Sequence, residues 1–200
     1  MVQVRGGMGI VNPVVQHPGT IGILATDGSP GWWIVSCYHV LCRLNRAPFV
    51  KGEEIRLADS TTSPDVIAHV DRALVGLDAA AGIVAGEVEV LPGIFGLPPV
   101  TAPSEPTEGM VVAKYGHATQ YTEGTILRVD GDDVWIRGGD DPNARLSAAG
   151  DSGAVWVARD TWSPVVLHTG TNDAGMIPYA RGIRLLTVLE QFCLEVILGG

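Results

Sequence analysis

The segment Ala148-Ala149-Gly150-Asp151-Ser152-Gly153-Ala154-Val155 is the most informative part of this 200-residue chain. Gly150 and Gly153 flank Ser152, and glycines at these positions allow a tight turn that exposes the hydroxyl and lets backbone N–H groups converge. The same tetrapeptide on its own also occurs in polar surface turns of glycine-rich chains. Its meaning therefore depends on the residues that accompany it.

Two earlier segments contain the partners that a serine nucleophile requires. Ser36–Leu41 places His39 directly after an apolar run, and Asp78 stands before the small apolar residues Ala79–Ala81. A carboxylate in such surroundings is expected to be partly buried and to need a hydrogen-bonding partner. Asp71, which also precedes a short apolar run, is the alternative acid. The order histidine, aspartate, serine, with gaps of 39 and 74 residues, is that of the chymotrypsin-type triad.

Short apolar or alternating runs separated by turn residues predict an all-β chain. The expected strands are Thr20–Thr26, Gly31–Ser36, Glu54–Ala58, Val66–Val75, Ala80–Val84, Met110–Tyr115, Glu123–Val129, Asp133–Arg137, Ala154–Ala158, Val165–His168 and Ile177–Ile183. A proline-rich stretch at 91–106 divides them into two comparable sets. Strands at this spacing favour barrels or sandwiches.

We expect a single domain over residues 1–200, built from two β units. The first barrel would cover about residues 14–95, a linker about 96–108, and the second barrel about 109–183. Over Arg184–Leu198 the apolar residues recur at three- and four-residue spacing, which predicts a C-terminal amphipathic helix at about 184–198.

These segments resemble the trypsin/chymotrypsin-like serine proteases, and more closely a small bacterial and plant-type branch with a single protease domain. The shared segments are Ser36–Leu41, Asp78–Ala81 and 148–155. Between them, Gly116-His117-Ala118-Thr119-Gln120-Tyr121-Thr122-Glu123-Gly124 matches the branch's Gly-x-x-Thr-x-x-Thr-x-Gly element. The likeness runs from about residue 20 to 192 and implies an all-β fold of two six-stranded-type β-barrels with a C-terminal helix.

The resemblance also implies a role for each matching residue. Ser152 would be the nucleophile, His39 the general base, and Asp78 the residue that orients His39. The backbone N–H groups of Gly150 and Ser152 would form the oxyanion hole. In secreted relatives a freshly cut N-terminal amine pairs with the aspartate before the nucleophile. That aspartate is Asp151 here, and the sequence leaves its partner open.

The segment Val166-Leu167-His168-Thr169-Gly170-Thr171 resembles one wall of the specificity pocket in glutamyl endopeptidases and picornavirus-type main proteases. In those families the histidine contacts a Glu or Gln side chain, with a hydroxyl nearby that would be Ser147 here. We therefore expect Ser147, His168, Thr169 and Gly170 to bind substrate, with Glu or Gln before the scissile bond. The alternative is that His168 is bonded to a neighbouring strand.

The composition excludes other classes of protein. A net charge of −9 without a Lys/Arg cluster predicts neither a nucleic-acid nor a membrane partner. Cys37, Cys42 and Cys193 show no CxxC spacing, so we expect no metal site. One disulfide is possible, but we interpret Cys37 and Cys42 as free thiols. The N-terminus lacks the apolar core of a signal peptide, and no apolar run reaches the roughly 18 residues of a membrane helix. Both features favour a cytoplasmic location.

The expected activity is that of a serine endopeptidase acting on a protein or peptide through an acyl-enzyme, without metal or organic cofactor. Two alternatives stay open. One is a catalytically silent or conditionally active protease-fold domain that serves protein binding. The other is a self-processing protease domain of a larger chain, with a regulatory domain or partner chain. A complete triad argues against a binding module, because binding alone does not require all three residues.

Overall fold

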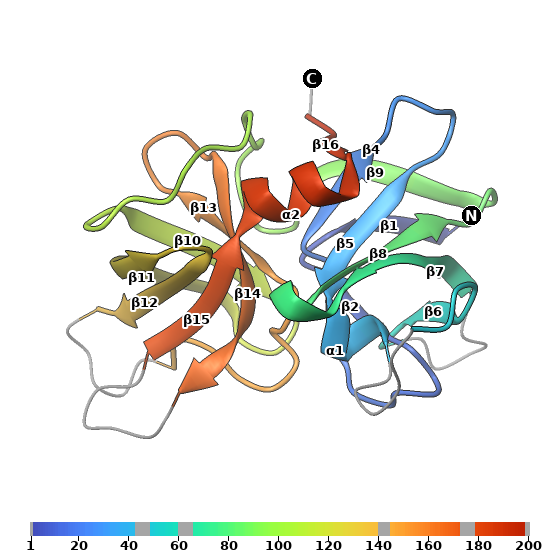
Figure 1. The fold of residues 1–200 in the computed structure, drawn as a ribbon, viewed down its shortest axis with the longest axis horizontal. Helices are drawn as coiled ribbons and strands as arrows, with labels where there is room; N and C mark the ends of the chain where they lie inside the picture. Colours follow the sequence, from blue (N-terminus) through green and yellow to red (C-terminus); the bar gives the residue numbers. More distant parts are fainter. Residues whose placement is uncertain (1, 43–48, 60–65, 140–144, 173–178, 199–200) are drawn as a thin grey trace.

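Strands dominate the structure, as the alternation of short apolar runs and turns predicts (Figure 1). The computed structural model describes residues 2–42, 49–59, 66–139, 145–172 and 179–198. Two β units lie side by side, and the helix α2 (Leu185–Phe192) passes across the junction between them (Figure 1). The expected all-β class with a helix near the C-terminus is confirmed.

The second unit is a closed six-stranded barrel whose neighbouring strands are all antiparallel. In barrel order its strands are β10 (Val111–Gly116), β11 (Gln120–Asp130), β12 (Asp133–Gly138), β15 (Tyr179–Arg184), β14 (Pro164–Asn172) and β13 (Val155–Ala158). Closure leaves no unpaired strand edge. Buried side chains such as Val112, Ile126 and Trp156 fill the interior.

The first unit is an open sheet of eight strands in the described residues. Their order is β16 (Glu195–Val196), β4 (Ile23–Thr26), β5 (Trp33–Cys37), β8 (Ala79–Val84), β7 (Val66–Leu74), β6 (Glu54–Leu57), β2 (Gly9–Val11) and β3 (Gly19–Thr20). A separate parallel pair consists of β1 (Val2–Gly6) and β9 (Val88–Ile94). The fold class is therefore as predicted, with the first unit an open sheet and not a closed barrel in the residues that the structure describes.

Each strand predicted before residue 173 has an observed counterpart, usually with bounds shifted by a few residues. The predicted strand Ile177–Ile183 begins outside the described residues, and β15 covers its remainder. Four strands were not predicted: β1, β2, β9 and β16. Two of them lie upstream of residue 14, where we expected the first unit to begin.

The C-terminal helix is shorter than the predicted 184–198. It ends at Phe192 because Cys193 adopts a left-handed conformation (φ 52°), which reverses the chain. The residues after Cys193 pair with the edge of the first sheet and do not continue the helix. Glu195 and Val196 form β16 opposite Thr26 and Ala25 of β4. The apolar spacing of residues 193–198 thus reflects packing beside the first unit and not a continued helix.

The larger hydrophobic core joins the two units. It contains Ile34 and Ala80 from the first sheet together with Val155, Leu167 and Ile183 from the barrel. Strand β5 ends and strand β8 begins at this shared core, where Cys37 lies opposite Ala79. None of the described helices has the length and apolar character needed to cross a membrane.

Candidate active site

His39 and Asp78 meet at the ends of two paired strands. His39 belongs to the single turn α1 (Tyr38–Leu41), which continues directly from β5, and Asp78 lies between the short helix η1 (Val75–Leu77) and β8. The β5–β8 register places Cys37 opposite Ala79, so the residues that follow and precede these partners come together. The sequence separation of 39 residues is closed by this strand pairing.

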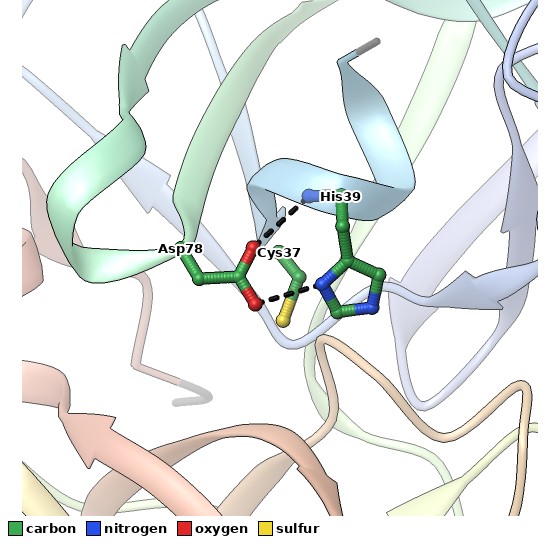
Figure 2. Close-up of side chains that lie close together, drawn as sticks. All are labelled: Cys37, His39 and Asp78. Atoms are coloured by element: carbon green, nitrogen blue, oxygen red, sulfur yellow. Dashed lines mark hydrogen bonds and ion pairs between the residues drawn. The ribbon is translucent and has the colours of Figure 1, made fainter. Parts of the chain in front are cut away.

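Both oxygens of Asp78 are used on His39 (Figure 2). The backbone N–H of His39 donates to Oδ1 at 3.0 Å, and the ring atom Nδ1 lies 2.7 Å from Oδ2. The carboxylate can only accept, so we assign the ring proton to Nδ1. The lone pair of Nε2 is then free to take a proton.

The alternative acid, Asp71, lies elsewhere. It is on β7, where its carboxylate pairs with Lys51 and approaches Arg72 at 3.8 Å. Asp71 is therefore paired with these two cations. The acid beside the imidazole of His39 is Asp78.

Ser152 lies in a turn that is docked onto the first unit. Its carbonyl accepts the N–H of Thr20 at 2.8 Å, and Thr20 Oγ1 donates to the carbonyl of Gly150 at 2.8 Å. Gly153 has φ +93°, and a Cβ there would collide with Ser36 Oγ on β5. Glycine at 153 is therefore required for the turn to approach the strand that leads to His39.

One carbonyl links the serine turn to the histidine segment. The backbone oxygen of His168 accepts the N–H of Gly153 at 2.8 Å and the thiol of Cys37 at 3.1 Å. The Cys37 sulfur in turn lies within 4.8 Å of a ring nitrogen of His39 and of a carboxylate oxygen of Asp78. These contacts bring the half-buried Ser152 turn and the His39–Asp78 pair to the same junction between the two units.

The missing partner of Asp151 is Lys114, and both side chains are fully buried. Lys114 Nζ donates to Asp151 Oδ2 at 2.9 Å and to Thr119 Oγ1 at 2.9 Å. The Thr119 hydroxyl, together with the N–H groups of Ala118, Thr119 and Ala148, completes the set of donors to Asp151. Burial alone would raise the pKa of Asp151, but the Lys114 charge and these hydrogen bonds outweigh it and lower the pKa to about 2.

The glycine-flanked segment 116–124 supplies three of the donors to Asp151, from Ala118 and Thr119. A Cβ at Gly116 would collide with Asp151 Oδ1, so only glycine lets β10 pass this close to the carboxylate. Lys114 was not among the residues predicted from the sequence, although a signal for it exists. In Val111–Gly116 it is the single cation of an apolar strand, and period-two alternation places it on the same buried face as Val112.

Ser147 and His168 form a second buried polar pair. His168 Nε2 lies 2.6 Å from Ser147 Oγ, and Trp156 Nε1 donates to His168 Nδ1 at 3.4 Å. Because indole can only donate, Nδ1 is the acceptor and Nε2 carries the ring proton. Burial, with a smaller contribution from Lys114, lowers the pKa of His168 to about 3, so its imidazole is neutral near pH 7.

The predicted substrate-binding residues fall into two groups. Thr169 and Gly170 line a cavity of about 480 Å³ together with Asp78. Ser147 and His168 are not part of that lining and are only 8% and 1% exposed. A Cβ at Gly170 would meet no atom within 4 Å, which leaves this part of β14 open.

All three cysteines are free thiols, which confirms the prediction for Cys37 and Cys42. Cys37 and Cys42 are buried and Cys193 is exposed. Burial and the nearby Asp78 carboxylate raise the pKa of Cys37 well above its usual value. The Cys37 sulfur is therefore a protonated thiol and not a nucleophile.

Solved structures with a similar fold are known. The chain has the chymotrypsin-like fold of bacterial serine proteases. No protein-family model and no curated protein matches its sequence.

Three solved structures illustrate the similarity. A glutamic acid-specific serine protease, described as using a histidine triad in substrate binding, has a TM-score of 0.75 and 15% identity, covering 97% of this chain and 100% of that one. Thermobifida fusca protease A has a TM-score of 0.73 and 16% identity, covering 99% and 100%. Cellulomonas bogoriensis chymotrypsin has a TM-score of 0.70 and 14% identity, covering 98% and 100%. At such identities the similarity concerns the fold.

Proposed function

We propose that this protein is a serine endopeptidase with Ser152 as nucleophile, His39 as general base and Asp78 as the residue that orients the base. The observation that carries the proposal is the His39–Asp78 pair. Asp78 holds both the backbone N–H and the ring N–H of His39, which fixes the imidazole in the tautomer whose Nε2 accepts protons. A serine hydroxyl needs such a base to become nucleophilic near neutral pH.

The anchoring of the Ser152 turn supports the same proposal. Five hydrogen bonds hold Asp151, and Thr20 holds the residues on either side of it through Gly150 and Ser152. A turn fixed in this way keeps its backbone N–H groups in place before substrate binds. We assign the oxyanion hole to the N–H groups of Gly150 and Ser152, where one donor lowers the barrier by about 3–4 kcal/mol.

The proposed reaction has two halves. Ser152 Oγ attacks the scissile carbonyl while His39 Nε2 takes the hydroxyl proton, and the carbonyl oxygen becomes an oxyanion. Collapse of this intermediate breaks the C–N bond, and His39 returns the proton to the leaving amine. Water then attacks the acyl-enzyme with His39 again as base, which releases the acid and restores Ser152.

A serine-reactive fluorophosphonate probe tests the proposal. We expect the probe to label the folded protein at Ser152, the Ser152→Ala variant to stay unlabelled, and a matched Ser147→Ala variant to keep its labelling. Circular dichroism confirms that each variant is folded. If the folded protein is not labelled, the enzyme proposal fails and the silent protease-fold alternative takes its place.

For specificity we propose a glutamine or glutamate side chain before the scissile bond, bound through Ser147 with His168 behind it. Ser147 is the more exposed member of the pair, at 8% against 1%. Because His168 Nε2–H donates to Ser147 Oγ, the serine hydroxyl proton is free to donate to a substrate oxygen. The nearest buried cation, Lys114, is already neutralised by Asp151. A neutral carboxamide avoids burying an unpaired charge, which favours glutamine over glutamate.

A library of peptides that vary at this position tests the specificity. We expect the highest kcat/KM for glutamine, followed by glutamate. Ser147→Ala should lower both by about tenfold, the value of one hydrogen bond, and should leave peptides with apolar residues there unchanged. A preference for Arg, Lys or aromatic residues would refute the role of the Ser147–His168 pair.

A further inference from the structure

The Cys37 thiol lies beside the hydrogen bond between His39 and Asp78. The Sγ of Cys37, a ring nitrogen of His39 and a carboxylate oxygen of Asp78 all lie within 4.8 Å of one another. Figure 2 shows that the three side chains converge, with the sulfur below the gap between the carboxylate and the ring. No other trio of His, Cys, Asp or Glu groups gathers this closely among the described residues.

These three groups are a zinc-type ligand set. Thiolate, imidazole and carboxylate all bind Zn²⁺, and open zinc sites use three protein ligands plus a water. Zinc–ligand bonds of about 2.0–2.3 Å place tetrahedral ligand atoms roughly 3.3–3.6 Å apart. The Nδ1–Oδ2 pair, now at 2.7 Å, would therefore have to open by somewhat less than 1 Å.

We propose that Cys37, His39 and Asp78 form an inhibitory Zn²⁺ site, in which the ion replaces the hydrogen bond between His39 and Asp78. Binding of the ion depends only on these three residues. The inhibition rests on the proposed peptidase function.

The ion bonds to Sγ, to Nδ1 and to the Asp78 carboxylate; the thiol proton passes to solvent, and the Nδ1 proton is replaced by one on Nε2. One proton is therefore released for each ion bound. A protonated Nε2 cannot accept the Ser152 proton, so the same binding event that occupies Nδ1 removes the general base.

The surroundings of Cys37 accommodate this change. The thiol gives up its hydrogen bond to the His168 carbonyl, but that carbonyl keeps the Gly153 N–H at 2.8 Å and is not left unsatisfied. The side chains of His39 and Asp78 are 25% and 34% exposed, which gives the ion a path from solvent. The sequence did not predict the site, because Asp78 follows Cys37 by 41 residues and the cysteines do not have the CxxC spacing typical of zinc sites.

Cobalt titration of the full chain tests the binding step. Co²⁺ serves as a spectroscopic substitute for Zn²⁺, since a thiolate–cobalt bond gives charge-transfer absorption and four-coordination gives intense visible bands. We expect both signals at one ion per chain, and their loss when Zn²⁺ is added. Cys37→Ser should lose the charge-transfer signal, whereas Cys42→Ala and Cys193→Ser should keep it. Absence of the signal from the wild-type chain, or its persistence in Cys37→Ser, would overturn the site.

The labelling rate of Ser152 by the fluorophosphonate tests the consequence. We expect Zn²⁺ to slow labelling of the wild type at least tenfold, reversibly by chelator, and Cys37→Ala to require about 100-fold more Zn²⁺, given that even an outer partner of a ligand is worth 10–100-fold in affinity. Equal sensitivity of wild type and Cys37→Ala would overturn the proposal, because the ion would then bind without the thiol. If the metal-free protein is not labelled at all, the peptidase proposal fails while the cobalt titration still decides the site.

Discussion

Asp78 contacts His39 through two atoms, and this double contact determines the state of the imidazole. The backbone bond to Oδ1 fixes the position of α1, and the ring bond to Oδ2 fixes the proton on Nδ1. An asparagine of the same shape could keep the first bond but would present either an amide donor or a weaker acceptor to the ring. The two contacts of Asp78 can therefore be separated by substitution.

We expect Asp78→Asn to slow Ser152 labelling and peptide turnover by about 10⁴-fold, the loss that this change causes in the serine-protease triad. The physical cause is the wrong tautomer, in which Nε2 carries the proton. Asp71→Asn is the control and should change neither rate more than about threefold, because Asp71 pairs with Lys51 and Arg72. A large loss in Asp71→Asn with full activity in Asp78→Asn would assign the acid to the other strand.

His168 should make the stability of the protein depend on pH. Its folded-state pKa of about 3 lies below the ordinary value of 6.5, so between these values the unfolded chain binds the proton and the folded chain does not. Stability therefore falls as pH decreases through this window, by about 2 kcal/mol between pH 6.5 and 4.5. Denaturant unfolding at several pH values measures the slope.

The His168→Gln variant tests the assignment of this slope. It removes the titrating group while keeping a polar side chain, and its stability should decrease less over the same pH range. His17→Gln is the matched control at an exposed histidine and should unfold like the wild type. If His168→Gln keeps the full slope, the pH dependence comes from other groups.

At the level of strands and turns, the serine turn is held by β10 and by the turn between β10 and β11. Lys114 enters from β10, and the N–H groups of Ala118 and Thr119 enter from the turn. A buried ion pair of this kind is costly to break, because the remaining charge has no partner. The segment 116–124 is thus a structural support for the serine turn, in addition to forming part of the barrel.

Lys114→Met should lower the free energy of unfolding by about 3–5 kcal/mol and strongly reduce Ser152 labelling, because Asp151 is left buried without its cation. The double variant Lys114→Met/Asp151→Asn removes the stranded charge and should recover part of the lost stability. Denaturant unfolding and probe labelling of the two variants check both effects. Equal or greater destabilisation in the double variant would contradict the coupling between Lys114 and Asp151.

Local patterns in the sequence predict some elements of this fold and not others. The strands around His39 and Asp78 were predictable because their apolar runs and flanking turns are local. The burial of Lys114 could be read from the alternation of β10, but its pairing with Asp151 could not, because the pair joins residues 37 apart through the packing of the barrel. The parallel pairing of β1 with β9, in which Val2 lies opposite Val88, was likewise not predictable from local patterns. The early end of α2 depended on a sheet edge that accepts β16, which apolar periodicity does not report.

At the level of the whole molecule, the last residues connect the two units. Helix α2 packs on β14 and β15 of the barrel, and the carbonyl of Phe192 accepts a hydrogen bond from Arg72 on β7 of the first unit. The chain then continues into β16 on β4, followed by a bond from the N–H of Ile197 to the carbonyl of Leu24. The candidate site lies at the junction that this segment spans, so its geometry depends on how firmly the units are joined.

A shared core predicts that both units unfold together. Leu189 is buried in the core that contains residues of both sheets, and Leu189→Ala should lower the free energy of unfolding by about 2–5 kcal/mol within a single transition. Hydrogen exchange should then show amides of β4 and β14 losing protection by the same amount. Leu127→Ala, at an exposed site on β11, should change stability by less than about 0.5 kcal/mol. Two separate transitions, or loss of protection in the barrel alone, would mean that the units fold independently and that the junction holding His39 and Ser152 is maintained by the site's own hydrogen bonds.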